Sequence, residues 1–476
     1  MAPDHHPSRP PDIELPTGLP LSAMTMLALV AATLAWIFGA GAWSAALGGP
    51  LILLFMGLEW KRLARVAKVL ALASGAVVIL VAGLGKLTLA GLVEATDRAM
   101  FLTAFVTVLG FLQSAARSSP MIRRCGHVLV HQPPGRRYLV LTSGGALFGM
   151  LLNLGGVNLL ANIVQQGVEA NRPTAGDRIA DIRLKRMSLA ILRGFATVPM
   201  WSPVAVTLVI LLSSMPDLKW AQIAPYGICL SLAYLGLGWA VDRLTYPAPS
   251  RGAASGRPEP LTPLLNLVVL AVALPGGALA VSSLLSISLI SGLVLIVPVF
   301  SILWIFLQMR GTVDRPLART WGRLRHVTLP SLSEMHSEIG IFAASSFIGV
   351  LLAPVVDVEA TGEWIRAIGL NSGSILMLAF WFIAGLGMLG LNPILTVTIA
   401  VEVLPHIPDL DMDPLTVAIM ATCSWAWIVN SGPFAASTRM LGRIIGHEPG
   451  EIAMRWNGSY CVALFVLLSA GLLAFG

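Results

Sequence analysis

Runs of about 20 apolar residues recur along this chain, and the charged residues gather between them. A run of this length crosses the ~30 Å hydrocarbon core of a bilayer as an α-helix, because a helix satisfies its own backbone polar groups. Only 12% of the 476 residues are charged, whereas a soluble domain carries about 25%. The sequence therefore predicts an all-α polytopic membrane protein.

Eleven helices are predicted to cross the membrane. They lie near residues 22–40, 43–58, 69–92, 98–115, 187–215, 221–242, 262–283, 285–308, 337–356, 414–440 and 453–475. Two more apolar stretches, 139–166 and 373–405, are interrupted in the middle by Asn, Gly or Pro. A helix stops at membrane depth only where protein or water satisfies the freed backbone groups. We expect these stretches to form two re-entrant hairpins.

Two of the crossing segments, 187–215 and 414–440, contain similar breaks at ATVPMWSPVAVT (Ala196–Thr207) and WAWIVNSGPFAAST (Trp425–Thr438). Each follows one of the hairpins, so the order hairpin, broken helix, helix occurs once in each half of the chain. Paired interruptions in corresponding places of two halves are the best sequence pointer to a transport site. The pattern predicts inverted-topology repeats, in which Asn153 can align with Asn392 and Ser202–Pro203 only loosely with the Ser-Gly-Pro at 431–433.

The charge of the loops predicts the orientation, because cytoplasmic loops are rich in Lys and Arg. The segment 59–68 has four basic residues and one acid, and 117–137 has five arginines and no acid. The segments 167–186, 242–260 and 309–326 are also basic, whereas 357–364 and 406–414 are acidic. If both hairpins return to the side that they entered from, every basic loop lies inside and the acidic ones outside. The N-terminus is then cytoplasmic, and the cell inner (plasma) membrane is the expected location.

This charge pattern also explains the net charge of +7, so binding to nucleic acid is not predicted. The predicted parts are a disordered cytoplasmic tail (1–21), scaffold helices (22–116), the arm, inner hairpin and broken helix of the first repeat (117–243), a cytoplasmic linker (244–261), further scaffold helices (262–336), and the arm, outer hairpin and broken helix of the second repeat (337–476).

The segments Pro133–Val164 and Leu376–Pro405, each placed between an arm and a broken helix, resemble the ion transporter superfamily. The most similar families are the divalent anion–sodium symporters and the arsenite and citrate carriers. The resemblance implies a homodimeric elevator transporter, with hairpins and broken helices moving against a fixed scaffold. The symporters carry Ser-Asn-Thr at both hairpin tips, where it helps bind sodium and substrate. In this chain Asn153 or Asn158, and Asn392, match the tip asparagine, while the neighbouring Ser and Thr are missing.

If four half-helices meet at the midplane, their N-terminal ends attract anions through the helix dipole, and unwound carbonyls with Asn or Thr oxygens can hold a small cation. The predicted substrate- and ion-binding residues are Asn153, Gly155, Gly156, Asn158, Ser202, Pro203, Asn392, Thr396, Asn430, Ser431, Gly432 and Pro433, with Thr207, Ser437 and Thr438 as a second tier. Small and polar residues in membrane helices also serve close packing. For a single asparagine such as Asn153, both interpretations stay open.

Neither hairpin tip nor broken helix contains a carboxylate, which disfavours a cation–proton antiporter because such a protein needs a buried acid. Glu402, near the outer end of its hairpin, is expected at the interface. No HExxH, GxSxG or Walker A motif occurs, so neither an enzyme nor ATP drive is predicted. The expected function is secondary active transport of a small anion, an organic carboxylate or a sulfur-containing relative, coupled to sodium or protons. The alternative is a proton-driven exporter of a metalloid or neutral solute. No cofactor is expected beyond Na⁺ as a coupling ion, and membrane lipid is the other partner.

Overall fold

The computed structural model describes residues 19–246, 260–310, 315–408, 410 and 412–475. Within these ranges all regular structure is helical and there is no strand, so the all-α prediction is confirmed. The predicted tail (1–21) and linker (244–261) lie largely outside the described residues.

The helices are, in chain order, α1 (Leu21–Ile37), α2 (Ala42–Ala46), α3 (Gly48–Glu59), α4 (Arg65–Gly83), α5 (Leu89–Arg117), α6 (Pro120–Val130), α7 (Pro134–Leu152), α8 (Leu154–Ala175), α9 (Asp177–Ala196), α10 (Val198–Trp201), α11 (Val206–Ser214), α12 (Trp220–Thr245), α13 (Thr262–Leu285), α14 (Leu289–Met309), α15 (Pro316–Arg323), α16 (Leu329–Glu334), α17 (His336–Leu352), α18 (Val358–Ala367), α19 (Ser372–Met388), α20 (Pro393–Val403), α21 (Pro414–Ser431), α22 (Ala436–Ile445) and α23 (Gly458–Phe475). Two π-helical turns, η1 (Leu324–Thr328) and η4 (Glu451–Trp456), and two 3₁₀ turns, η2 (Ala353–Val355) and η3 (Leu404–His406), join some of them.

Each of the eleven predicted spans corresponds to one helix or to a run of adjacent helices. Within the described residues, eight helical segments are long and apolar enough to cross a membrane. They are Arg65–Gly83, Leu89–Arg117, Asp177–Ser214, Trp220–Thr245, Thr262–Leu285, Leu289–Met309, His336–Val355 and Pro414–Ile445. The three other predicted spans are shorter apolar helices, Leu21–Ile37, Trp43–Glu59 and Gly458–Ala474. The chain is therefore a polytopic helical membrane protein.

Both interrupted stretches form pairs of helices joined by a short turn. In the first hairpin α7 and α8 meet at Asn153, and in the second α19 and α20 are joined by residues 389–392. The second hairpin is preceded by α18, which meets α19 at an angle of 113°. Both turns lie within the predicted stretches 139–166 and 373–405.

The basic segment 167–186 is not a loop. Helices α8 and α9 continue through it and are separated only by Gly176. Arg172 pairs with Glu169 at 2.8 Å, Asp177 at 3.3 Å and Asp181 at 3.0 Å, across the turn between the two helices. The prediction was wrong here because it equated polar composition with irregular structure, whereas charged residues are good helix formers outside the hydrocarbon.

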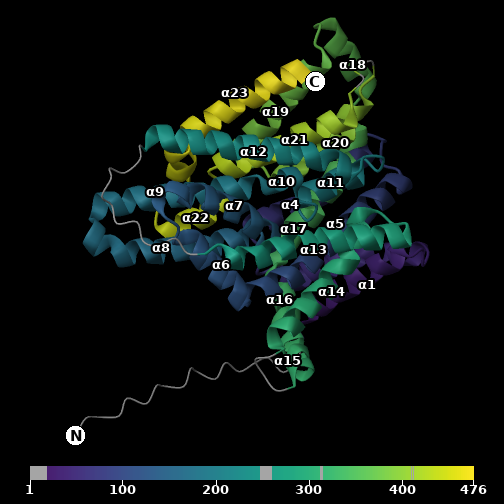
Figure 1. Ribbon diagram of the computed structural model, residues 1–476. Coiled ribbons are helices and arrows are strands. Elements are labelled where there is room, and N and C mark those ends of the chain that lie inside the picture. The colour runs from purple at the N-terminus through teal and green to yellow at the C-terminus, as the bar shows by residue number, and fades with distance from the viewer. Residues whose placement is uncertain (1–18, 247–259, 311–314, 409, 411, 476) are drawn as a thin grey trace.

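Each hairpin packs against both broken helices in a crossed pattern. Helix α7 contacts α9, as α19 contacts α21 in the second repeat. Each return limb contacts the broken helices of both repeats: α8 lies beside α9 and α22, and α20 lies beside α21 and α11. In Figure 1, α8 and α22 occupy one end of the bundle, and α11 and α20 the opposite end. The contacts α8–α22 and α20–α11 are equivalent in the two halves, which agrees with the predicted repeat.

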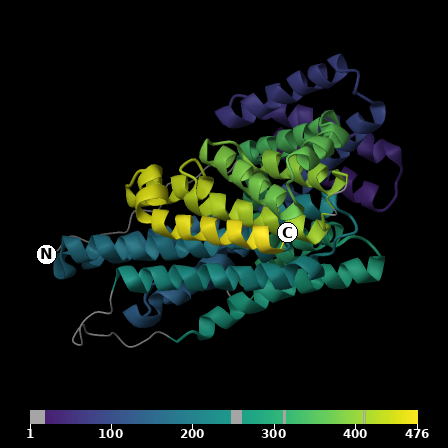
Figure 2. The same ribbon diagram turned by 90° about the horizontal axis from the view of Figure 1, so that it is seen from above.

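Several of the other long helices pack around α5, whose most apolar window is fully buried. Helix α5 contacts α1, α3, α14 and α17, and α4 packs on α17. Viewed from above in Figure 2, the purple N-terminal helices lie at one side of the molecule and the green-to-yellow C-terminal helices at its middle. The buried α5 thus connects the N-terminal helices with the helices of the two repeats.

Candidate functional site

Asn153 forms the tip of the first hairpin in an unusual backbone conformation. Its φ is 51° and its ψ −133°, between the end of α7 and the start of α8. Positive φ is uncommon for residues other than glycine, although asparagine tolerates it better than most. Within the described part of the chain, the half-buried Asn153 side chain makes no hydrogen bond and does not cap α8. A strained residue with an amide that no neighbour uses is a candidate ligand.

The two glycines after this tip have different surroundings. A Cβ on Gly156 would lie 2.7 Å from the backbone carbon and oxygen of Phe148, so Gly156 lets the two limbs of the hairpin approach closely. A Cβ on Gly155 would meet the Arg117 Nε and the Leu152 Cβ, both at 3.6 Å, and the Arg117 Nη2 at 4.0 Å. Gly156 therefore has a packing role, whereas Gly155 faces Arg117 across an ordinary contact distance.

We expect Gly156→Ala to destabilise the protein by roughly 1–3 kcal/mol, because the backbone of the facing limb must move. Gly155→Ala is the matched control, since its methyl group fits at ordinary contact distance and alanine favours a helix. Thermal melting of the two purified variants measures the difference. Equal melting temperatures would mean that the limbs are not in close contact at Gly156.

Asn158 lies one turn beyond the tip, on an exposed part of α8. The Asn162 amide nitrogen donates to its backbone oxygen at 2.8 Å and to its side-chain oxygen at 2.7 Å. Of the two asparagines that can match the family tip, Asn153 is therefore at the turn and Asn158 on the helix that follows.

At the second hairpin tip, the asparagine caps the helix that follows it. The Asn392 side chain accepts a hydrogen bond of 3.0 Å from the Ile394 N–H, an N-cap of α20. The Thr396 hydroxyl donates to the Pro393 carbonyl at 3.3 Å. Asn153 and Asn392 thus both precede a return limb, as aligned, but only Asn392 uses its side chain as a cap.

The two helix breaks have the same backbone course. Ser202 has φ −79° and ψ 120°, and Gly432 has φ −75° and ψ 117°. A proline follows each, and the N–H three residues on, of Ala205 or Ala435, donates back to the Ser202 or Gly432 carbonyl at 2.9 or 3.1 Å. The structure therefore aligns Ser202-Pro203-x-Ala205 with Gly432-Pro433-x-Ala435, which corrects the looser alignment with residues 431–433 made from the sequence.

The break at Gly432–Ala435 satisfies its freed carbonyls with its own side chains. The Ser437 hydroxyl donates to the Val429 carbonyl at 2.9 Å, and the Thr438 hydroxyl donates to the Gly432 carbonyl at 2.6 Å. The Ser431 hydroxyl bonds back to the Trp427 carbonyl at 2.8 Å. Ser437 and Thr438 consequently stabilise the unwound turn directly, whereas the Ser431 bond lies within the last turn of α21.

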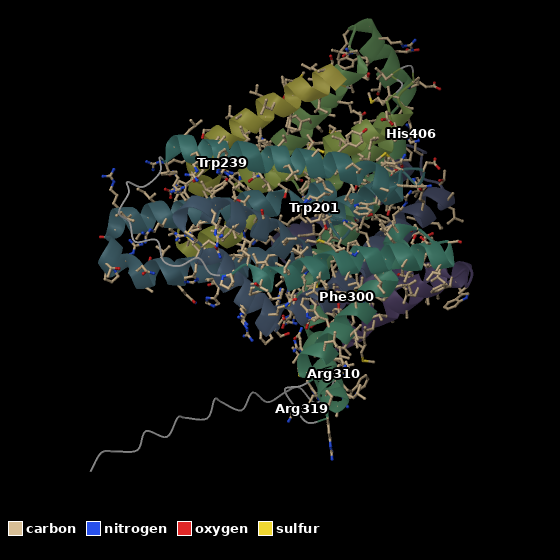
Figure 3. All side chains as sticks on the ribbon, in the orientation of Figure 1. Trp201, Trp239, Phe300, Arg310, Arg319 and His406 are labelled. Carbon is tan, nitrogen blue, oxygen red and sulfur yellow. The ribbon has the colours of Figure 1, made fainter. Side chains whose placement is uncertain are left out.

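Fewer side-chain hydrogen bonds stabilise the break at Ser202–Ala205 among the described residues. The Trp220 indole N–H donates to the Trp201 carbonyl at 3.0 Å, and Trp201 lies near the middle of the molecule (Figure 3). Ser202 is fully buried, and its hydroxyl has no hydrogen-bond partner within the described residues. A buried hydroxyl without a partner costs about 1–3 kcal/mol. Ser202, like Asn153, is therefore a predicted site residue whose side chain has a polar group without a hydrogen-bond partner among the described residues.

The hairpin tips lie against the broken helices. A Cβ on Gly149, one turn before Asn153, would touch Val198, and one on Gly387 would touch Ile428, the residue equivalent to Val198. At the second tip Gly390 is in contact with the Phe434 ring of the break. Helix α10 also contacts α21. The structure thus brings each predicted tip to a break, around the place where the two broken helices cross.

The helix N-termini in this region favour negative charge, although Arg117, the basic side chain beside Gly155, also interacts with the Glu338 carboxyl. No acidic residue occupies the first turn of α8, α11 or α22, and none of these helices has a side-chain cap. Their free N–H groups leave partial positive charge at each N-terminus. Arg117 adds a full charge beside Gly155. Within the described residues, no group of three His, Cys, Asp or Glu side chains could hold a metal ion.

No family model matches the chain, and no curated protein matches it in sequence. Among solved structures, the crystal structure of the YdaH transporter of Alcanivorax borkumensis is similar, at 15% identity over 79% of this chain and 84% of that chain. Its TM-score is 0.48. At that TM-score the similarity does not establish a shared fold, and the fold described above rests on this chain's own helices.

A buried arginine beside the breaks was not predicted. Arg193 of α9 is 3% exposed. Its Nε donates to the Asn457 side-chain oxygen at 2.9 Å, and one terminal nitrogen donates to the Tyr138 hydroxyl at 2.9 Å and the Gly238 carbonyl at 3.0 Å. The guanidinium also lies 4.3 Å from the Tyr460 ring centroid. No carboxylate pairs with it among the described residues, so neutral dipoles and an aromatic face stabilise this charge.

This arginine is connected to the second break through one side chain. Asn457, whose oxygen accepts from Arg193, donates its amide N–H to the Asn430 carbonyl at 3.1 Å. Asn430 is fully buried and lies in the last turn of α21 before the break. The network therefore joins α9 of the first repeat to the unwound end of α21 in the second. The sequence signal for it was an arginine within the apolar run of residues 187–215.

Proposed function

We propose that this protein is a secondary active transporter of a small anion, an organic carboxylate or a sulfur-containing anion. The observation that carries the proposal is the pair of breaks with one backbone course, each beside the tip of a helical hairpin. Irregular backbone of this kind inside an apolar bundle is tolerated where it lines a site, and paired broken helices are typical of transporters.

An anion is favoured over a cation as the transported solute. The uncapped N-termini of α8, α11 and α22 and the guanidinium of Arg117 all favour negative charge. A carboxylate can accept hydrogen bonds from the Asn153 amide and from the Ser202 hydroxyl, which have no partner in the described structure. The backbone turns at Pro203, Gly432 and Pro433 then keep the two broken helices unwound.

Sodium and protons are the two candidate coupling ions, and different residues would bind each. The oxygen atoms of Asn153 and Ser202 are suitable ligands for a small hard cation, while the carbonyls of the second break already accept hydrogen bonds. For protons the candidate is Glu402, one of whose carboxylate oxygens is buried without a hydrogen-bond partner within the described residues. Loss of coupling in Glu402→Gln would favour protons.

The proposed mechanism is an elevator, in which the hairpins and broken helices move as a body against the outer helices of a homodimer. Its support is the crossed packing of α8 on α22 and α20 on α11, which binds both repeats into one unit. We place the N-terminus in the cytoplasm and the protein in the inner membrane, because the basic segments then lie inside.

The test is the melting temperature of the purified protein in sodium chloride against choline chloride at fixed ionic strength, followed by a panel of carboxylates and sulfonates. A ligand at a hundred times its Kd stabilises the folded state by roughly 2.7 kcal/mol. We expect a sodium-specific rise and a further rise with one class of anion. Neither rise, with no response of transport in proteoliposomes to sodium, would contradict the sodium-coupled form and favour a proton-driven exporter of a metalloid or neutral solute.

Asn153→Gly separates binding from folding in the same assay. Glycine adopts a φ of 51° without strain, which is worth of order 1–3 kcal/mol, and this offsets its greater chain entropy. We therefore expect Asn153→Gly to melt in choline no lower than the unsubstituted protein but to lose the ligand-dependent rise. Asn158→Ala is the matched comparison on the same limb. A lost rise in Asn158→Ala alone would move the site one turn along α8.

A further inference from the structure

An apolar crevice opens between the first hairpin and α13. It has a volume of about 270 Å³ and lies between α6, α7 and the start of α13. Its walls include Leu129, Val140, Leu147, Leu264 and Leu267. A buried water needs two to four polar partners, and in this crevice the Ser143 hydroxyl is the one polar side-chain group among the described lining residues. Hydrocarbon suits the crevice better than water.

The basic residue Arg136 lies at one end of the crevice. Arg136, Val140, Ser143 and Leu147 have the spacing i, i+4, i+7 and i+11, so they follow one face of α7. Arg136 is one turn nearer the start of α7 than the residues that line the crevice. The Arg136 Nε donates to the Gln132 side-chain oxygen at 2.8 Å, which fixes the guanidinium at this end.

The crevice is bounded by a contact between the arm and α13. The Cys125 thiol of α6 donates to the Pro263 carbonyl at 3.2 Å, in the first turn of α13. Burial raises the pKa of this thiol, which keeps it protonated as a donor. The remaining face of α6 carries exposed Arg123, Arg124 and His127. The described residues of α6 include no acid that would repel an anionic head group at Arg136.

We propose that this crevice binds one anionic phospholipid of the surrounding bilayer, with an acyl chain against the leucines and the phosphate at Arg136. Basic pockets between membrane helices are known to select anionic head groups. The lipid would lie between hairpin limb α7 and helix α13, and so would stabilise their contact. The inference does not depend on the proposed transport function.

The experiment compares phosphatidylglycerol with phosphatidylcholine. Native mass spectrometry of the detergent-purified protein measures retained lipid, and thermal melting measures the response to each added lipid. We expect the unsubstituted protein to retain phosphatidylglycerol and to melt higher with it than with phosphatidylcholine. Ser143→Trp should fill the crevice and abolish both effects, because Ser143 is exposed and a ring there replaces the acyl chain.

Arg136→Gln should keep the response to phosphatidylcholine and lose the preference for phosphatidylglycerol. Two matched controls should behave as the unsubstituted protein: Leu232→Trp, which adds a ring at an exposed position of α12, and Arg123→Gln on the exposed face of α6. The proposal is overturned if Ser143→Trp folds as a monodisperse protein and retains phosphatidylglycerol as before. Equal responses to both lipids in the unsubstituted protein would overturn the head-group assignment.

Discussion

Replacing Arg193 with glutamine is expected to destabilise the protein by roughly 2–4 kcal/mol, although it removes a buried charge. Burying an arginine in a membrane costs about 2.5–3.5 kcal/mol on insertion scales. Against this, each hydrogen bond to a charged group contributes about 1.5–3 kcal/mol, and the cation–π contact about 2 kcal/mol. Arg193 makes three such bonds, to Asn457, Tyr138 and Gly238, and lies over the Tyr460 ring. The contacts outweigh the cost of burial.

Thermal melting in detergent measures the loss, with Arg178→Gln, at an exposed position of the same helix, as the control. Arg193→Lys distinguishes geometry from charge. An ammonium keeps the charge but lacks the planar fork that reaches Asn457 and Tyr138 together. We expect it to melt as low as the glutamine variant. A lysine variant that melts like the unsubstituted protein would show that charge alone matters.

Gly227→Ala is expected to have the second large effect. Helix α12 packs at Gly227 directly on the backbone of Met200, one residue before Trp201 and the first break. An added Cβ would overlap the Met200 carbonyl oxygen, which cannot rotate away as a side chain can. We expect a cost at or above the upper end of the roughly 1–3 kcal/mol typical of overpacking. The displaced α10 would also weaken the bond from Trp220 to the Trp201 carbonyl.

Gly236→Ala is the control on the same helix, because nothing lies within 4 Å of the added methyl group. Alanine favours a helix over glycine by up to about 1 kcal/mol, so this variant should melt at or above the unsubstituted protein. Melting curves and monodispersity of both purified variants decide the matter. Similar behaviour of the two would mean that α12 does not rest on the first break.

The sequence contains enough information to place the hairpins and breaks, for a physical reason. Asn153, Asn392, Pro203 and Pro433 interrupt apolar runs in which an interruption is otherwise costly, so their positions are visible without any tertiary contact. The structure agrees with this prediction, because each interrupted run bends or unwinds at those residues. What polar residues do after the break depends on neighbours, and Asn392 is a cap while the equivalent Asn153 is not.

The Arg193 network could not be predicted in the same way. Its partners come from far along the chain: Asn457 is 264 residues away and Tyr138 is 55 residues away. Hydropathy and local motifs contain no information about such pairs. A proton carrier at membrane depth is expected to be an acid, and Arg193 is not one. A lone arginine inside a membrane run is by itself a signal of a buried polar network.

The ion-paired turn between α8 and α9 has a use as a reporter. Because Arg172 holds both helices at this turn, α8 and α9 continue as rigid rods beyond the apolar segments to which they belong. If the first hairpin rotated about the crossing of the broken helices, the displacement would therefore be large at Gly176, at the far end of α8. Gly176 itself has no side chain. A spin label at this turn, with its partner at the exposed Arg65 where α4 begins, would report the angle of the hairpin as a distance.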